Sequence, residues 1–276
     1  MADNVSTMLT AHSSQLTAHS SQLTAHSSQL TAHSSRAVLY LIAPAYNESQ
    51  NIAQFVEEWY PVVESHDGGG LSRLVVIDDG SKDDTYVILQ ELSRARPLLQ
   101  PITKPNSGHG STCIYGYKYA LEHGAEYIFQ TDTDGQTRAE EFEAFWALRN
   151  DYDAVLGKRP DRKDGAARVF ISNVLRLVER VMFGIYIPDA NVPYRLMKPE
   201  LVAKYLPYLT DDLFLLNVMQ TVCFVWFHEN ITFKDITFRP RQGGESFVNI
   251  KSIVKIGWRT VRDFLKLRKN LREAAA

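Results

Sequence analysis

The chain has 276 residues, a formal net charge of −2 at pH 7 and 45% hydrophobic residues. This composition is ordinary for a globular protein, and the net charge alone identifies no class of partner. No apolar run reaches the roughly 18 residues that a membrane-spanning helix needs, and the N-terminus lacks the pattern of a secretory signal. Cys113 and Cys223 show neither metal-ligand spacing nor a disulfide framework. We therefore expect a chain of one or two domains in a reducing, cytoplasmic compartment.

The first 36 residues are dominated by a seven-residue repeat. Leu-Thr-Ala-His-Ser-Ser-Gln begins at Leu9, Leu16 and Leu23, and a fourth copy from Leu30 ends in Arg36. Each repeat has a single apolar residue larger than Ala, whereas the seam of a coiled coil needs two. We therefore predict a mostly disordered tail over residues 1–36. The alternative is metal binding by the repeated histidines, which are His12, His19, His26 and His33.

The period of this repeat also indicates an origin in the gene. A seven-base unit read in triplets returns to frame after seven codons, and the unit CAGCTCA then encodes Gln-Leu-Thr-Ala-His-Ser-Ser, the residues of the repeat. We expect the tail to be translated repeat DNA, in which gain or loss of one unit switches expression off. Varied synonymous codons among the four copies would contradict this origin.

Residues 37–246 alternate between patterns typical of strands and of helices. Short apolar runs, typical of buried strands, are separated by polar segments with helix-start signals. Such alternation predicts an α/β domain with a mostly parallel central sheet flanked by helices, in which ligands bind at the carboxyl ends of the strands. The expected strands cover residues 38–42, 74–77, 97–104, 127–129 and 151–156, and the expected helices residues 48–60, 83–96, 111–123, 166–183 and 213–227.

Two carboxylates one residue apart, Asp132 and Asp134, follow the fourth expected strand. Carboxylate oxygens suit Mg²⁺ or Mn²⁺, which keep water and substrate phosphate oxygens in their other positions. The alternative is a strand-ending turn, where Asp and Gly are common. Two other strand ends carry polar side chains that we expect in the same crevice, namely Tyr46 and Glu48 at one end and Asp78 and Asp79 at the other.

Three motifs, in this order and spacing, resemble glycosyltransferase family 2. They are Ala-Pro-Ala-Tyr-Asn-Glu at residues 43–48, Val-Ile-Asp-Asp-Gly-Ser at residues 76–81 and Asp-Thr-Asp-Gly-Gln at residues 132–136. The resemblance covers residues 38–246 and implies the GT-A fold, a Rossmann-like architecture that binds nucleotide sugars. Within the family the chain is most similar to polyprenol-phosphate sugar transferases of the dolichol-phosphate mannose synthase type. Further residues carry this narrower resemblance, namely Gly157, Arg159, Arg168, Ser172, Asp189, Arg195, Arg241, Gly244 and Ser246.

The resemblance implies roles for individual residues. Those implied to bind the nucleotide sugar are Pro44, Tyr46, Glu48, Asp78, Asp79, Asp132 and Arg241. Those implied to act in catalysis are Asp132, Asp134, Gln136, Arg159 and Arg168. The two aspartates of the third motif would hold the metal ion on the diphosphate, where it acts as a Lewis acid for the departing nucleotide.

Simpler roles remain open for several polar residues. Asn47 is suited to cap a helix that begins at Glu48. Arg159 and Arg168 are alternatively ordinary surface arginines. His109, in a glycine-rich loop, is placed either to touch a phosphate or to form a loop-to-helix turn.

The acceptor decides whether a general base is needed. A polyprenyl phosphate is already an anion at neutral pH, so cationic side chains suffice to hold it. A sugar hydroxyl needs a carboxylate within hydrogen-bond reach, for which Asp211 and Asp212 are candidates, with Asp212 as our choice. Both are alternatively the cap and first turn of the helix expected at 213–227. Asn217 stands where the polyprenol group often has a glutamate, which departs from that narrower resemblance.

The C-terminal segment, residues 247–276, predicts a basic amphipathic helix. Such a helix with Trp and Phe suits an anionic membrane surface. The alternative is a helix that packs on the preceding domain with a solvated basic face. Between residues 249 and 272 one acid, Asp263, stands against the cations Lys251, Lys255, Arg259, Arg262, Lys266, Arg268, Lys269 and Arg272.

These patterns lead to one functional expectation and two alternatives. We expect an inverting glycosyltransferase that moves a sugar from a nucleoside diphosphate to a polyprenyl phosphate at the cytoplasmic membrane face, with Mg²⁺ or Mn²⁺. The first alternative is transfer to a hydroxyl of a surface polysaccharide or glycolipid, with Asp211 or Asp212 as base. The second is a non-catalytic nucleotide-sugar-binding scaffold. We expect no binding of nucleic acid, and the motifs leave the sugar, the base and the oligomeric state undetermined.

Overall fold

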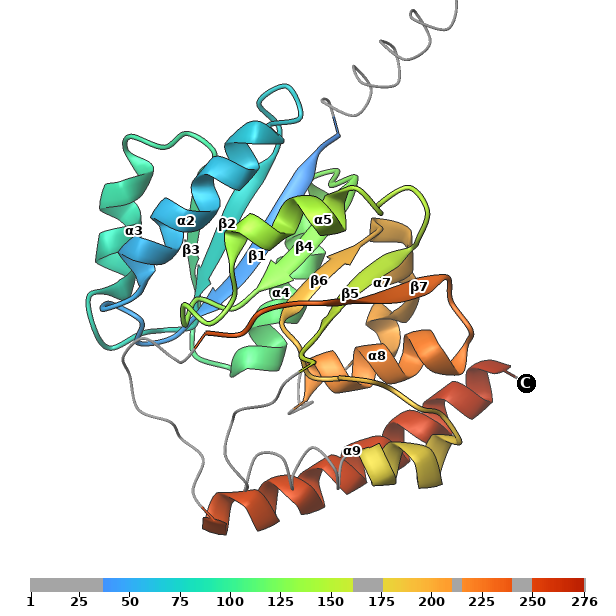
Figure 1. Ribbon diagram of the computed structural model, residues 1–276. Coiled ribbons are helices and arrows are strands. Elements are labelled where there is room, and N and C mark those ends of the chain that lie inside the picture. Colours follow the sequence, from blue (N-terminus) through green and yellow to red (C-terminus); the bar gives the residue numbers. More distant parts are fainter. Residues whose placement is uncertain (1–36, 161–175, 210–214, 240–249, 276) are drawn as a thin grey trace, which may run out of the picture. The chain divides into compact units, whose positions relative to one another are not determined.

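The structure is a computed structural model that describes residues 37–160, 176–209, 215–239 and 250–275, and the side chains of the last helix from residue 260 to 273 (Figure 1). A seven-stranded sheet in the order β3-β2-β1-β4-β6-β5-β7 forms the centre of this part of the chain. Its strands are β1 Leu39–Ala45, β2 Arg73–Asp78, β3 Leu99–Thr103, β4 Tyr127–Thr131, β5 Ala154–Lys158, β6 Tyr194–Met197 and β7 Ile231–Asp235.

The expected mostly parallel α/β sheet is confirmed. β1 pairs in parallel with β2 and β4, β2 with β3, and β5 with β7. The exception is β6, which runs antiparallel to β4 and β5. No strand was expected at β6, Tyr194–Met197, whose four residues are all buried. So short a strand with an arginine inside it gives too little periodicity to be recognised.

Helices cover both faces of the sheet (Figure 1). They are α2 Ile52–Ser65, α3 Thr85–Ser93, α4 His109–Glu122, α5 Phe142–Trp146, α7 Pro199–Tyr205, α8 Leu216–Trp226 and α9 Ile250–Ala275, with short 3₁₀ turns at Ala139–Glu141 and Leu206–Tyr208. Residues 176–183 are also helical. Most of these lie where the sequence predicts a helix, with ends that differ by a few residues.

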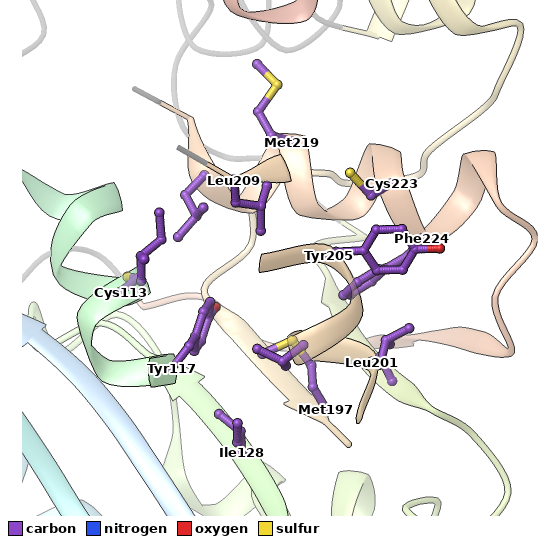
Figure 2. Packing of buried hydrophobic residues seen from close by; sticks show 14 of the residues in the cluster. Cys113, Tyr117, Ile128, Met197, Leu201, Tyr205, Leu209, Met219, Cys223 and Phe224 are labelled. Carbon is purple, nitrogen blue, oxygen red and sulfur yellow. The ribbon is translucent and has the colours of Figure 1, made fainter. Parts of the chain in front are cut away.

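Alternate residues of β4 face different helix layers, as the pleat of a strand requires. Phe129 packs against Trp59 of α2 and Tyr194 of β6, with ring centroids 5.4 and 4.7 Å apart. Ile128 belongs to the large apolar cluster that α4, α7 and α8 share with the sheet (Figure 2). Gly116 lets α4 approach closely, because a Cβ there would lie 2.3 Å from Cγ2 of Ile42 on β1.

Helix α9 packs on the domain through the apolar side chains of its described half. Phe264, Leu267 and Leu271 are buried, and the Phe264 ring meets that of Phe183 at 5.4 Å. For this half, the alternative of a helix packed on the domain is the arrangement observed. Among the described residues, no helix combines the length and apolar character that crossing a bilayer requires.

Candidate functional site

The carboxyl ends of β1, β2 and β4 lie at one edge of the sheet. β1 and β2 end in register, with Ala45 beside Asp78. After β4, the Thr133 hydroxyl donates a 3.0 Å hydrogen bond to the carbonyl of Pro44. Because parallel strands end at the same edge, the loops that follow them are brought together. The fold therefore gathers the three motif segments into one site.

Asn47 ties the loop after β1 to the loop after β2. Its backbone N–H donates to the Ser81 hydroxyl at 2.9 Å, and its side-chain oxygen accepts from the backbone N–H of Lys82 at 2.8 Å. Its φ of +53° is in the left-handed region, which Asn tolerates better than most residues. The expectation that Asn47 caps a helix from Glu48 is wrong, because α2 begins only at Ile52.

Tyr46 and Glu48, next to Asn47, point in different directions. The Tyr46 side chain is exposed at the rim of the site, whereas Glu48 is buried. The Glu48 carboxylate accepts a 2.7 Å hydrogen bond from the Asn51 side chain, and its backbone N–H donates to the Thr85 hydroxyl at 2.9 Å. Tyr46 therefore offers a ring to a ligand, while Glu48 also holds the loop against α3.

Asp78 accepts hydrogen bonds across the ends of β2 and β3. It is buried and accepts from the Thr103 hydroxyl at 2.8 Å and from the backbone N–H of Ser81 at 3.2 Å. These contacts fix the two strand ends relative to each other.

Asp79 organises the glycine-rich loop before α4. It is buried and accepts from the Lys104 ammonium group and from the backbone N–H groups of Ser107 at 2.9 Å and Gly108 at 2.8 Å. Burial by itself raises the pKa of Asp79, but these hydrogen bonds outweigh it, so the pKa lies below its ordinary value. The ionised carboxylate thus holds residues 104–108 in place.

Asp132 makes a direct contact with His109, the first residue of α4. The imidazole Nε2 lies 3.0 Å from Oδ1 of Asp132, and both side chains remain partly exposed. The pKa of His109 is raised well above its ordinary value, because Cys113 and Asp132 favour the protonated ring more than burial disfavours it. His109 therefore occupies the predicted position between a loop and a helix, and its ring lies beside the metal-binding candidate.

Asp134 and Gln136 connect the same loop to the segment after β7. Oδ1 of Asp134 accepts from the backbone N–H of Gln136 at 3.2 Å. Gln136 in turn makes two hydrogen bonds with Arg239. Its side-chain Nε2 donates to the backbone carbonyl of Arg239 at 3.1 Å, and its backbone carbonyl accepts from the backbone N–H of Arg239 at 2.8 Å. The Arg239 guanidinium pairs with Glu58 of α2 at 3.0 Å and with Glu140 at 3.6 Å.

Arg159 is held at the end of β5 by a carboxylate. Its Nε and Nη2 donate to the two oxygens of Asp189 at 2.8 and 3.1 Å, and its guanidinium carbon lies 4.9 Å from the centre of the Phe238 ring. Such a fork-to-fork pair fixes the plane of the guanidinium group. The interpretation of Arg159 as an ordinary surface arginine is wrong, since the side chain is largely buried.

A second arginine, Arg195, lies fully buried behind the site. It donates to the carbonyl of Asn217 at 3.0 Å and to the Thr221 hydroxyl at 2.7 Å, both on α8. Burial lowers the pKa of Arg195 to about 10. It faces Gln130 across the β4–β6 pair, and Gln130 shares a hydrogen bond with Tyr117 of α4. A polar layer thus connects β4, β6, α4 and α8 directly beneath the Asp132 loop.

A comparison with family models decides the relationship of this chain to known proteins. The model of glycosyl transferase family 2 matches residues 40–206, which is more than half of the chain. The chain belongs to glycosyl transferase family 2. The resemblance inferred from the three motifs is therefore confirmed, and the matched region contains the site described above from Pro44 to Arg195.

Several curated relatives share this family. The chain is 32% identical over 112 residues to a UDP-N-acetylglucosamine–dolichyl-phosphate N-acetylglucosaminyltransferase of Methanococcus voltae, which covers 36% of this chain and 42% of that protein. It is 26% identical over 172 residues to a polyprenol monophosphomannose synthase of Mycolicibacterium smegmatis, covering 59% and 63%. An undecaprenyl-phosphate mannosyltransferase of Micrococcus luteus is 25% identical over 214 residues, covering 74% and 85%. The first two matches thus span less than two thirds of the relatives' own length.

Solved structures support the fold of this family 2 member. Glucosyl-3-phosphoglycerate synthase of Mycobacterium tuberculosis, crystallised with Mn²⁺ and UDP-glucose, superposes with a TM-score of 0.63 at 13% identity, over 88% of this chain and 83% of that chain. At this identity the likeness shows the fold alone. The GT-A architecture expected from the sequence is thereby confirmed.

The residues after β4 fit a divalent ion in their donor chemistry. Asp132 and Asp134 offer hard carboxylate oxygens, the ligand type that Mg²⁺ and Mn²⁺ prefer. In the described part of the chain, no group of three or more His, Cys, Asp or Glu side chains converges as a metal site. Two carboxylates suit an ion that takes its remaining ligands from a diphosphate and water.

Four predicted site residues lie outside the described part of the chain, namely Arg168, Asp211, Asp212 and Arg241. Two residues that the structure places at the site were not predicted, Lys104 and Arg239. Lys104 directly follows β3, so a cation at a strand end was an available signal. Arg239 meets the Asp134 loop only through the fold, and no local pattern marks it.

Proposed function

We propose that this family 2 member is an inverting glycosyltransferase that moves one sugar from a nucleoside diphosphate to a polyprenyl phosphate, with Mg²⁺ or Mn²⁺. The observation that carries the proposal is the position of Asp132 and Asp134 at the edge of the sheet where the strands β1 and β2 also end. The names of the relatives from Mycolicibacterium smegmatis and Micrococcus luteus favour the polyprenyl-phosphate acceptor.

The rim of the site offers the chemistry that a nucleotide requires. The exposed Tyr46 ring is available for stacking on a base. Asp78 and Asp79 are engaged in hydrogen bonds within the chain, so their contribution is to fix the two loops that flank the nucleotide. We assign Pro44 and Glu48 to the same wall, and Arg241 to the donor, as the motifs imply.

The reaction needs few proton transfers in this chain. An oxygen of the acceptor phosphate attacks the anomeric carbon while the bond from that carbon to the diphosphate breaks, which inverts the configuration. The acceptor is already an anion, so no side chain has to remove a proton from it. The bound divalent ion would supply charge neutralisation for the leaving diphosphate. Asp132 and Asp134 would hold that ion, Gln136 would keep Asp134 in place, and Arg159 and Arg168 would orient phosphate oxygens.

A polyprenyl phosphate is confined to a bilayer, so the enzyme must act at a membrane surface. We place it at the cytoplasmic face, as a peripheral protein held through α9. The basic face of that helix suits anionic headgroups. The alternative acceptor, a glycan hydroxyl with Asp211 or Asp212 as base, remains an outcome of the test below, as does the non-catalytic scaffold.

A metal-dependent donor screen tests the proposal. The purified full-length chain would be incubated with liposomes that contain undecaprenyl phosphate and with labelled UDP- and GDP-sugars, with and without Mn²⁺. Asp134→Ala would be compared with Glu91→Ala, which removes an exposed carboxylate on α3 away from the site. We expect label in the lipid fraction only with metal, and its loss in Asp134→Ala but not in Glu91→Ala.

Other outcomes would revise the proposal in defined ways. Donor binding without transfer to lipid, followed by transfer to added glycan acceptors, would replace the polyprenyl phosphate by a hydroxyl. Donor binding without transfer to any acceptor would favour the scaffold. Transfer that is unaffected by chelation and by Asp134→Ala would overturn the metal assignment.

A further inference from the structure

Four large apolar side chains are exposed on two neighbouring helical segments. Leu177 and Val181 stand one turn apart on helix 176–183, with 61% and 74% of their surface exposed. Tyr186 follows that helix at 69%, and Leu265 lies on α9 at 56%. Leaving this much apolar surface in water is unfavourable, and such a group marks an interaction site more often than a single exposed residue does.

The packing beneath these residues places the two helices side by side over α8. The Phe183 ring meets Trp226 of α8 at 5.5 Å and Phe264 of α9 at 5.4 Å. Figure 1 shows the yellow helix 176–183 beside the red α9. Since Phe183 and Phe264 are both buried in this contact, the opposite faces of the two helices point away from the core.

The outward faces are basic as well as apolar. On α9, four cations lie on the exposed side near Leu265, and a fifth lies near Val181. Among the described residues of the two segments, the acids Glu179 and Asp263 are buried, and Glu273 alone is exposed. The exposed cations are Arg180, Arg262, Lys266, Lys269 and Arg272.

We infer that these residues form a docking surface for an anionic lipid bilayer. The docking surface consists of Leu177, Val181, Tyr186 and Leu265 with the five cations just named. Its apolar side chains would enter the boundary between headgroups and acyl chains, and the cations would contact lipid phosphates. The inference rests on the proposed function, which holds the protein at a membrane through α9, and deepens it by adding helix 176–183 and Tyr186 to the surface that meets the bilayer.

Charge argues against a second copy of this chain as the occupant. A symmetric dimer through this surface would bring identical basic patches against each other. With one exposed acid among the described residues of the surface, such a contact would leave the repulsion between cations largely uncompensated. An anionic bilayer instead complements the cations and accepts the apolar side chains.

Vesicle binding of the full-length protein tests the docking surface directly. Vesicles of phosphatidylglycerol with phosphatidylcholine would be compared with vesicles of phosphatidylcholine alone, without donor or polyprenyl phosphate. The double variant Leu177→Ser, Val181→Ser should bind at least about tenfold more weakly, because it loses two apolar side chains that would enter the bilayer. The matched control is Leu71→Ser, Val87→Ser, which changes an exposed leucine and an exposed valine outside the surface, at 60% and 52% exposure. This control should bind like the unchanged protein.

The charged part of the surface is tested separately. Lys269→Gln, Arg272→Gln should lower binding to the anionic vesicles about tenfold at low salt and leave the weak binding to phosphatidylcholine unchanged. Far-ultraviolet circular dichroism and thermal unfolding of each variant show that it is folded. Equal binding by the unchanged protein and the two docking variants would overturn the inference. It would also be overturned by a dimer in light scattering that Leu177→Ser, Val181→Ser dissociates.

The failure of this inference is distinguishable from failure of the proposed function. Vesicle binding is measured without any sugar transfer, and transfer can be assayed with polyprenyl phosphate in detergent micelles. Transfer in micelles together with unaltered vesicle binding by the docking variants would reject only the surface.

Discussion

Gln136 and Arg239 stand 103 positions apart in the chain and exchange two hydrogen bonds at 3.1 and 2.8 Å. Through them, the loop that carries Asp134 is attached to the segment after β7, and the ion pair of Arg239 with Glu58 attaches both to α2. Asp134 is therefore positioned by elements from three distant parts of the chain. We expect Arg239 to act as a positioning residue for the metal site.

Gln136→Ala should lower the apparent affinity of the enzyme for the metal ion, with a smaller effect on the stability of the fold. One lost hydrogen bond is worth about 1 kcal/mol, which corresponds to a roughly fivefold higher Mn²⁺ concentration for half-maximal transfer. The matched control is Asn150→Ala, which removes a 3.0 Å hydrogen bond from the Tyr127 hydroxyl at the surface. A metal titration in which both variants behave like the unchanged protein would contradict this role.

Gly80→Ala should destabilise the fold by about 2–3 kcal/mol, from backbone strain and a close contact. Gly80 has φ +67°, and a Cβ there would lie 2.9 Å from the backbone nitrogen of Asn106. Gly70 has φ +86° with nothing within 4 Å of the corresponding Cβ position, so Gly70→Ala should cost about 1 kcal/mol from strain alone. Denaturant unfolding of the two variants measures the difference, and equal losses would show that the contact with Asn106 relaxes.

Asp79→Asn should lower the free energy of unfolding at pH 7 by about 2–3 kcal/mol, the range for hydrogen bonds to a charged group. The folded pKa of Asp79 lies below its ordinary value, so its contribution is present above the unfolded pKa and is lost as the pH falls through the folded pKa. The difference between the variant and the unchanged protein should therefore shrink on acidification below about pH 4. Urea unfolding at pH 7 and at pH 3 checks this, and a difference independent of pH would contradict it.

Leu267→Ala on α9 should destabilise the protein by about 2–4 kcal/mol, because it leaves a cavity in the core. Leu267 is 2% exposed, whereas its neighbour Leu265 is 56% exposed. Leu265→Ala should change the free energy of unfolding by less than about 0.5 kcal/mol. Thermal unfolding of both variants tests whether the described half of α9 is an integral part of the domain. A small effect of Leu267→Ala would indicate a loosely attached helix.

Much of the site could be predicted because its residues directly follow strands. Asp78, Asp132 and Pro44 lie at or just beyond strand ends, and the parallel alternation of strands and helices forces those ends together. Local pattern was less informative for Asn47, whose capping role was wrong because its side chain bonds Lys82, in a loop 35 positions away. β6 was missed because its pairing with β4 and β5, and not its own sequence, makes it a strand.

The sequence by itself determined the family, the α/β class and the acidic motif after β4, since these depend on short segments whose residue types and spacing are sufficient evidence. The tertiary structure decided how those residues are engaged. It paired Arg159 with Asp189, placed His109 on Asp132 and connected Gln136 to Arg239. It also used the apolar residues Phe264, Leu267 and Leu271 of α9 for packing on the domain. Each of these contacts joins residues of different elements, and hydrogen-bond and packing partners of that kind are set by the three-dimensional arrangement of the strands and helices.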